Sequence, residues 1–316
     1  MSSSTLSVGI IGTGAFAAVH AQALQTSDTA KLSACFDRNI GTSTDFAKKW
    51  GGKAVKSIED LLELKLDIIL IASPDETHAS IALTILKSTD APKIIIVEKP
   101  LCINRAELAE LETALKKSSV KIVVEHSRRF NRGFERLRDM IQSNQLGTDV
   151  LSVRFRYYAG WFHVGVHAVD TLRMLLGELE VVNATMKGVD RYPDDPLLDV
   201  ELRSKKYPHA QIHLEGIPEK HFKVFDLVLV QDKGRIRTVW YDIFIDRPQE
   251  DDAFAPLLVF KEHFKADDIF TALHRLYGMS SDYIKRGDET LLSLSGFEAA
   301  RGTMDILFDA TEKAHA

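Results

Sequence analysis

The chain has 316 residues, of which 45% are hydrophobic and 27% charged, and its formal net charge is −5. At ~150 residues per domain, this length predicts about two domains. The lack of a basic excess argues against nucleic-acid binding, and no apolar run approaches the ~18 residues of a membrane span. The two cysteines, Cys35 and Cys102, make no disulfide framework and are typical of a reducing compartment, so we expect a cytoplasmic protein.

The first 126 residues alternate between predicted strands and helices. Short apolar runs predict strands at 7–11, 31–36, 67–72, 93–97 and 121–124, and helices are predicted at 15–25, 81–87 and 105–117. This alternation implies right-handed crossovers and a parallel sheet, in which ligands bind beyond the carboxyl ends of the strands. The residues expected at those ends are Gly12, Asp37, Ser73, Lys99 and His126.

The pattern changes near His126. A charged amphipathic helix is predicted at 132–142, and two helices near 270–285 and 296–313 close the chain. The predicted strands between them lie at 151–158, 197–202, 211–214, 223–230 and 235–245, with a hairpin turn at 232–234. This part of the chain therefore predicts a mostly antiparallel sheet with helices on one side.

A glycine-rich run, Gly12-Thr13-Gly14-Ala15-Phe16-Ala17, joins the first strand to the first helix. Gly12 permits a tight turn, and Gly14 lets backbone N–H groups approach a pyrophosphate at the positive end of the helix. The next strand ends at Asp37, whose carboxylate is expected to accept hydrogen bonds from the ribose of NAD. Arg38 beside it leaves NADP as the alternative cofactor. In this context the loop predicts a Rossmann dinucleotide-binding domain over residues 1–126 of an α/β protein.

Two further motifs carry candidate catalytic groups. Lys99, in Glu98-Lys99-Pro100, is expected to hold a substrate oxygen or the nicotinamide carboxamide, the alternative being a solvated surface lysine. If residues 161–170 are helical, His163, His167 and Asp170 share one face. These three side chains are compatible with acid–base catalysis, with a metal site, or with histidines satisfied in an interface. Because nicotinamide accepts hydride without a metal, we expect an acid–base pair and no metal.

The order of these motifs resembles the Gfo/Idh/MocA family of NAD(P)-dependent oxidoreductases. The resemblance is carried by residues 12–17, 73–78 (Ser-Pro-Asp-Glu-Thr-His), 98–100, 129–131 (Arg-Phe-Asn), 165–170 (Gly-Val-His-Ala-Val-Asp) and the closing helix around 297–300. It implies that Lys99 is the active-site lysine and His167 the catalytic acid–base. It also implies an α+β second domain at 127–316 that binds substrate and forms a homodimer or homotetramer through its open, mostly antiparallel sheet.

One position departs from that family. Many of its dehydrogenases carry an acid four residues before the catalytic histidine, where this chain has His163. We therefore add His163 to the candidate catalytic residues. The departure also prevents a direct transfer of the family's inositol or glucose substrates to this chain.

The expected activity is hydride transfer between nicotinamide and a carbinol carbon of a sugar, polyol or sugar derivative. An NAD-dependent glycosidase and a non-catalytic dinucleotide-sensing regulator are the alternatives. The expected cofactor-binding residues are Gly12, Thr13, Gly14, Ala15, Phe16, Asp37, Arg38, Ser73, Pro74, His78, Glu98 and Lys99. The candidate substrate-binding residues are Arg129, Arg154, Arg156, Tyr158 and Asp170, for which a surface or subunit-interface role is the alternative.

Overall fold

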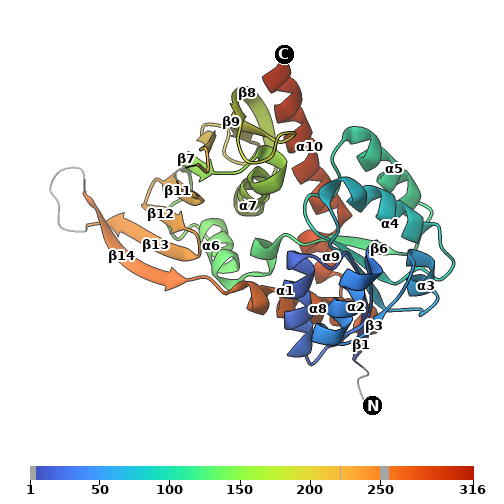
Figure 1. Ribbon diagram of the computed structural model, residues 1–316. Coiled ribbons are helices and arrows are strands. Elements are labelled where there is room, and N and C mark those ends of the chain that lie inside the picture. The colour runs from blue at the N-terminus through green and yellow to red at the C-terminus, as the bar shows by residue number, and fades with distance from the viewer. Residues whose placement is uncertain (1–4, 221, 250–255) are drawn as a thin grey trace. The chain divides into compact units, whose positions relative to one another are not determined.

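The computed structural model describes residues 5–220, 222–249 and 256–316, and the chain forms two compact units (Figure 1). The first unit comprises Met1–Phe130 and Ile269–Arg301, and the second comprises Asn131–Asp268 and Gly302–Ala316. Helices from late in the sequence thus belong to the first unit. The functional boundary near residue 126 stays a prediction.

The first unit contains a six-stranded parallel sheet in the order β3-β2-β1-β4-β5-β6. Its strands are β1 (Leu6–Ile11), β2 (Ala30–Phe36), β3 (Lys53–Ala54), β4 (Ile68–Ile71), β5 (Ile94–Val97) and β6 (Lys121–Val124). Every residue of β4 and β5 is buried. Such continuous apolar strands are expected where helices cover both faces of a parallel sheet. The predicted Rossmann architecture is confirmed.

Helices connect and surround these strands. They are α1 (Ala15–Gln25), α2 (Ile40–Trp50), α3 (Ile58–Leu62), α4 (His78–Leu86), α5 (Arg105–Leu115), α8 (Ile269–Arg286) and α9 (Thr290–Ser295), with short 3-10 turns η1 (Asp75–Thr77) and η2 (Ser127–Phe130). Asparagine side chains cap two of them, since Asn39 accepts from Gly41 N and Asn104 accepts from Glu107 N at the starts of α2 and α5.

The strand order reverses at β1, which pairs with β2 on one side and β4 on the other. Right-handed crossovers therefore place α1 and α4 on opposite faces of the sheet. The register aligns the carboxyl ends, because Ile11 pairs with both Phe36 and Ile71, and Ile71 pairs with Val97. The residues that follow these strands meet at one edge, and the crevice between β1 and β4 is the position where such sheets bind dinucleotides.

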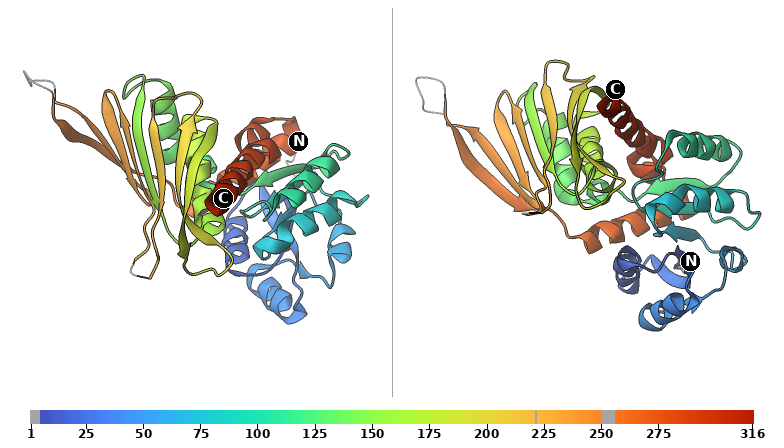
Figure 2. Two further views of the ribbon diagram at one scale, coloured as in Figure 1. Left: turned by 90° about the horizontal axis from the view of Figure 1, so that it is seen from above. Right: turned by 45° about the horizontal axis from the view of Figure 1, so that its top comes forward.

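The second unit contains an eight-stranded sheet in the order β14-β13-β12-β11-β7-β10-β9-β8, in which only the β7–β10 pair is parallel among the strands that the structure describes. Helix α6 (Arg132–Gln142) and α7 (Val166–Leu176) lie on one face (Figure 2). The strands are β7 (Val150–Tyr157), β8 (Leu179–Val189), β9 (Pro196–Ser204), β10 (Gln211–Gly216), β11 (Asp226–Gln231), β12 (Gly234–Val239), β13 (Asp242–Pro248) and β14 (Leu258–Lys265). The predicted mostly antiparallel sheet is confirmed.

The single strand predicted at 235–245 is wrong. The segment forms a hairpin in which Val239 of β12 pairs with Asp242 of β13, and Trp240 and Tyr241 make the turn. Trp240 adopts a positive φ of 56°, which is uncommon for a bulky residue. Because the turn contains no glycine, asparagine or proline, the sequence carries no ordinary turn signal there.

The last helix, α10 (Phe297–His315), contributes residues to both units. Within the second unit, the indole N–H of Trp161 donates to the carbonyl of Leu307 on α10, at 3.0 Å. None of the helices in the described parts of the chain is long and apolar enough to cross a membrane.

Candidate active site

Gly12 lies directly after β1, and its conformation and surroundings both require glycine. Its φ is +86°, and a Cβ built on it would lie 2.6 Å from the carbonyl oxygen of Ala72 and 2.7 Å from the Cα of Ser73. The loops that follow β1 and β4 therefore approach each other to backbone contact at the point where the strand order reverses. A side chain at position 12 would push these loops apart.

Gly14 precedes α1 and differs from Gly12 in both respects. Its φ is −77°, and a Cβ built on it meets no atom within 4 Å. No side chain caps α1, and its first turn carries no acidic residue. The first backbone N–H groups of α1 are thus left for an anion, as the predicted pyrophosphate site requires.

Asp37 is fixed by three hydrogen bonds from the two neighbouring loops. Thr13 donates from its backbone N–H (3.0 Å) and its hydroxyl (2.9 Å) to Oδ2, and the N–H of Asn39 donates to Oδ1 at 3.0 Å. Burial alone raises the pKa of this carboxyl, but these bonds and the charge of Arg38 outweigh burial and lower the pKa. A carboxylate offers about four lone pairs, so Oδ1 retains one for a ribose hydroxyl.

His78 connects the loops that follow β4 and β5. Its Nδ1 lies 2.7 Å from the carbonyl oxygen of Pro100, its Nε2 lies 2.8 Å from that of Ser73, and the imidazole is fully buried. Both ring nitrogens are therefore engaged by the protein itself. Any contribution of His78 to cofactor binding acts through the shape of these loops.

Lys99 follows β5 and is only 6% exposed, which does not fit a solvated surface lysine. The neighbouring Glu98 is also buried, and its Oε1 lies 3.0 Å from Nε2 of His20 on α1. Burial raises the pKa of Glu98, but the bond from His20 and the nearby charges of His20, Lys99 and His78 lower it overall. Lys99 thus has a carboxylate in its immediate surroundings.

In the second unit, His163 lies in a π-helical turn, η3 (Trp161–Gly165), that leads into α7. Its Nε2 lies 2.8 Å from the hydroxyl of Tyr192, and the two ring centroids are 4.1 Å apart. Asp195 accepts from the backbone N–H groups of Phe162 (2.8 Å) and His163 (2.7 Å). The loop between β8 and β9 therefore holds both the ring and the backbone of His163.

Burial raises the pKa of Asp195, although its hydrogen bonds from Phe162, His163 and Trp161 oppose that effect. Sequence reasoning missed both Tyr192 and Asp195. They lie about 30 residues after His163, in a segment without a motif, and only the folded chain brings them beside η3.

His167 lies in the first turn of α7 and is partly exposed. Asp170, one turn later, is buried, and its Oδ1 accepts from the hydroxyl of Thr303 on α10 at 3.0 Å. Asp170 thus bonds to α10, whereas the ring of His163 bonds to Tyr192. Among the described residues, no group of three His, Cys, Asp or Glu side chains is arranged to hold a metal ion.

The sheet separates the candidate substrate residues on β7 from α7. Tyr157 is buried on the helix side, where its ring packs 5.7 Å from that of Trp161. Arg154 and Arg156 alternate with it and are exposed on the other face, where Arg156 makes two bonds to Asp226, at 2.8 and 2.6 Å. The same alternation places Tyr158, the residue after β7, on the face of the sheet that carries the two arginines.

Arg129, the remaining substrate candidate, is buried in the first unit and donates from Nη1 to the carbonyl oxygen of Leu294 at 2.7 Å. This bond fastens η2 to α9. The assignment of Arg129, and of the candidates on β7, to substrate binding stays a prediction.

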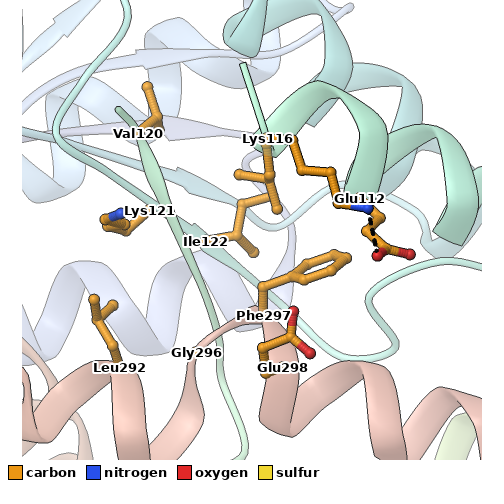
Figure 3. Close-up of a pocket in the computed structure, with 10 residues that line it drawn as sticks. Glu112, Lys116, Val120, Lys121, Ile122, Leu292, Gly296, Phe297 and Glu298 are labelled. Atoms are coloured by element: carbon orange, nitrogen blue, oxygen red, sulfur yellow. Dashed lines mark ion pairs between the residues drawn. The ribbon is translucent and has the colours of Figure 1, made fainter. Parts of the chain in front are cut away.

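A pocket of about 300 Å³ lies elsewhere in the first unit, between α5, β6 and the α9–α10 junction (Figure 3). Ile122, Leu292 and Phe297 give it an apolar lining, and the Lys116–Glu112 ion pair (3.0 Å) lies beside them. None of the predicted cofactor or catalytic residues is among its lining residues.

The strand order, the glycine loop and the fixed Asp37 define the first unit as a dinucleotide-binding Rossmann domain. Residues 6–126 match the family described as "Oxidoreductase family, NAD-binding Rossmann fold", GFO_IDH_MocA. Over these residues the chain is similar to the Gfo/Idh/MocA family, and the resemblance noted in the sequence is confirmed there.

Two curated relatives are named dehydrogenases. The chain is 30% identical over 150 residues to glucose-6-phosphate 3-dehydrogenase of Bacillus subtilis. The matched region covers 48% of this chain and 41% of the relative. It is 28% identical over 186 residues to myo-inositol 2-dehydrogenase of Thermotoga maritima, covering 54% and 55%. The match thus spans about half the length of these relatives.

The fold as a whole is similar to solved structures. A putative NADPH-dependent oxidoreductase from Desulfitobacterium hafniense superposes with a TM-score of 0.85 and 19% identity, covering 99% of this chain and 96% of the other. This similarity confirms the predicted combination of a Rossmann domain with a second α+β domain.

Proposed function

We propose that the chain is an NAD(P)-dependent dehydrogenase or reductase acting on a CH–OH group of a sugar, polyol or sugar derivative. The observation that carries this proposal is the geometry at the β1–β4 reversal, where Gly12 touches the Ala72–Ser73 backbone and Asp37 is held beside it. The names of the two curated relatives support the substrate class.

The residues present fit a dinucleotide. The backbone at the start of α1 would hold the pyrophosphate, and the spare lone pair of Asp37 would accept from a ribose hydroxyl. When bound, the cofactor supplies the two-electron chemistry by accepting or returning a hydride at C4 of its nicotinamide.

The remaining chemistry falls to the chain's own side chains. Oxidation of a carbinol removes a hydride from carbon and a proton from oxygen. We assign the proton to His167, which takes it as a general base and returns it in the reverse direction. We assign the developing negative charge on the substrate oxygen to the ammonium of Lys99.

His163 stands where many family members carry an acid. We assign a polar contact with the substrate to the His163–Tyr192 pair, with Tyr192 orienting the imidazole through its 2.8 Å bond to Nε2. An imidazole and a phenol both donate and accept hydrogen bonds, which suits a substrate with several hydroxyls.

NAD is the preferred cofactor in this proposal. The 2′-phosphate of NADP would bring negative charge next to the carboxylate of Asp37, whose lowered pKa keeps it ionised at neutral pH. Two like charges ~4 Å apart repel by about 4 kcal/mol at an effective dielectric near 20, before screening by salt.

We also place the protein in the cytoplasm as a homodimer or homotetramer formed through the open face of the eight-stranded sheet. Both cysteines are buried, and burial, followed by the charge of Asp37, raises the pKa of Cys35 to about 11. The open face mixes exposed arginines with half-buried apolar side chains such as Val228 and Phe244, a mixture typical of subunit interfaces.

A coupled screen tests the catalytic proposal. Purified protein with NAD or NADP is incubated with sugar phosphates, inositols, amino sugars and sugar nucleotides, and reduced cofactor is followed by its absorbance. We expect turnover with at least one carbinol substrate, and a loss of about 100-fold in Lys99→Ala. Tight cofactor binding without turnover on any of these classes would instead favour the regulator.

A further inference from the structure

A single turn in the loop between β8 and β9 holds His163 at both its ring and its backbone. The turn runs from Tyr192 to Asp195 and is closed by a bond from the N–H of Asp195 to the carbonyl oxygen of Tyr192, at 3.1 Å. Tyr192, its first residue, contacts the ring of His163. Asp195, its last residue, accepts from the backbone N–H groups of Phe162 and His163. All of these residues belong to the second unit.

The helical turn η3, which begins after Gly160, has no side-chain cap of its own. The first N–H groups of a helix find no partner inside it, and glycine has no side chain to accept them. The two carboxylate oxygens of Asp195 take one such group each, Oδ1 from Phe162 at 2.8 Å and Oδ2 from His163 at 2.7 Å. Asp195 thus does for η3 what an N-cap aspartate does, but from a position 32 residues after His163.

Gly160 is matched to this carboxylate. Its φ is +100°, and a Cβ built on it would collide with Oδ2 of Asp195. A side chain at position 160 is therefore incompatible with the carboxylate in its place. The carbonyl oxygen of Gly160 accepts from the N–H groups of Val164 (3.2 Å) and Gly165 (3.0 Å), and the second of these bonds makes the wide π turn. Such turns are rare and are frequently found at functional sites.

The residues just before the turn are fastened to the loop that follows β10. The backbone N–H of Glu219 donates to a carboxylate oxygen of Asp190, and Nη1 of Arg191 lies 3.4 Å from Oε1 of Glu219. The segment that leads into Tyr192 is therefore held from outside the turn. Through Tyr192 and Asp195, the turn passes this fixed position on to η3.

We propose that Asp195 is a positioning residue for the substrate contact made by His163. The inference rests on the proposed function, in which the His163–Tyr192 pair contacts the substrate. Asp195 does not touch the substrate in this account, since both of its oxygens are engaged by the backbone of η3. It fixes the backbone of His163, and the hydroxyl of Tyr192 then fixes the direction of the ring.

Substrate kinetics of three variants test this assignment. In Asp195→Ala, both bonds to η3 are lost, so His163 is no longer held in one position. We expect KM for the substrate to rise by about tenfold, the scale of one lost hydrogen bond. We expect kcat to change by less than about threefold, because binding alone is weakened. Asp195→Asn keeps one acceptor oxygen and should raise KM by about threefold. Asp194→Ala removes the neighbouring exposed carboxylate and is the matched control, with wild-type KM and kcat.

A double-mutant cycle separates positioning from a general loss of structure. If Asp195 acts through His163, its removal has nothing left to disturb once the imidazole is gone. The KM of the double variant, His163→Ala with Asp195→Ala, should therefore equal that of His163→Ala within about twofold. Two increases that multiply in the double variant would show that Asp195 does not act through His163. That result, or an unchanged KM in Asp195→Ala, would overturn the inference.

A readout without substrate separates this inference from the proposed function. In protein whose histidines carry the heavy nitrogen isotope, NMR signals of the ring nitrogens report the tautomer and hydrogen bonding of each imidazole. The signal of His163 is the one missing from His163→Ala. We expect it to move in Asp195→Ala and in Gly160→Ala, where a Cβ displaces the carboxylate, but not in Asp194→Ala. A signal unchanged in the first two variants would refute the inference whether or not a substrate has been found. A moved signal without turnover would refute only the proposed function.

Discussion

Asp37 carries the choice between NAD and NADP. Its carboxylate is fixed by Thr13 and Asn39, so it cannot turn away from a 2′-phosphate without breaking those bonds. Asp37→Ser should move the ratio of kcat/KM values towards NADP by at least about tenfold, because the repelling charge is gone. Steady-state kinetics with both cofactors measures this ratio.

Arg38→Ala is the matched control for this prediction. Arg38 is exposed beside Asp37. Its removal should weaken NADP use in the Asp37→Ser background while leaving NAD use by the wild type nearly unchanged. A wild type that already prefers NADP would show that Arg38 outweighs Asp37.

His167 sets the acidic side of the pH–rate profile in this account. A histidine that accepts the hydroxyl proton works only when neutral, so the oxidation rate falls as the pH drops and the imidazole is protonated. His167→Asn should remove most of the activity together with that acidic limb. Persistence of the same limb in the variant would assign it to another group. Dialysis against EDTA should leave wild-type activity intact.

At the scale of structural elements, alanine substitutions of Gly12 and Gly14 should have different effects: the first on stability, the second on cofactor binding. A Cβ at position 12 meets the Ala72 backbone at 2.6 Å with φ at +86°, whereas one at position 14 meets nothing within 4 Å. Gly12→Ala should therefore destabilise the fold by about 1–3 kcal/mol and lower the melting temperature by several degrees. Gly14→Ala should keep the wild-type melting temperature but weaken NAD binding by about tenfold, because the backbone can no longer approach the pyrophosphate.

Calorimetric titration with NAD and thermal melts of both variants check this pair of outcomes. A Gly14→Ala protein that binds NAD as tightly as wild type would mean that the pyrophosphate does not lie against α1. Unchanged stability in Gly12→Ala would contradict the backbone contact between the β1 and β4 loops.

The strands that sequence reasoning found are those with a regular apolar pattern. In the Rossmann sheet, β4 and β5 are continuous apolar runs, and β7 alternates between buried and exposed residues from Val153 onward. The strands it missed in the second unit, β8 and β14, are the two edges of the eight-stranded sheet. Most of their residues are exposed or half-buried, and register shifts at Val181/Asn183 and Met186/Gly188 interrupt the alternation of β8. Edge strands with little burial carry little signal.

In the candidate site, too, some residues could be predicted from the sequence and others could not. The residues at strand ends, such as Gly12, Asp37 and Lys99, followed from topology, because parallel strands end at one edge. The partners that fix the site residues were not predictable. Tyr277 is 179 positions after Glu98, and the bond between His20 and Tyr277 spans 257 positions, so no local spacing links them. Only packing brings such residues together.

At the scale of the whole molecule, the open face of the second sheet is the proposed subunit interface. Val228 lies near its centre on β11, opposite Arg154 of β7. Val228→Arg adds a third positive charge there, beside Arg154 and Arg237, which should shift the protein towards the monomer in sedimentation velocity without unfolding it. Lys87→Glu, on the exposed surface of the first unit, is the control and should sediment like wild type. A monomeric wild type, or an assembly unaffected by Val228→Arg, would place the interface elsewhere or remove it.

Direct hydride transfer is the central claim, and deuterium tests it most directly. A carbonyl form of the best substrate from the screen is incubated with NADH that carries deuterium at both C4 positions, and the product is examined by mass spectrometry and NMR. We predict one deuterium on the carbinol carbon for each NADH consumed, and at least about 100-fold slower transfer in Lys99→Ala. A product without deuterium, or release of a leaving group with no net change in NADH, would contradict the dehydrogenase and support the glycosidase instead.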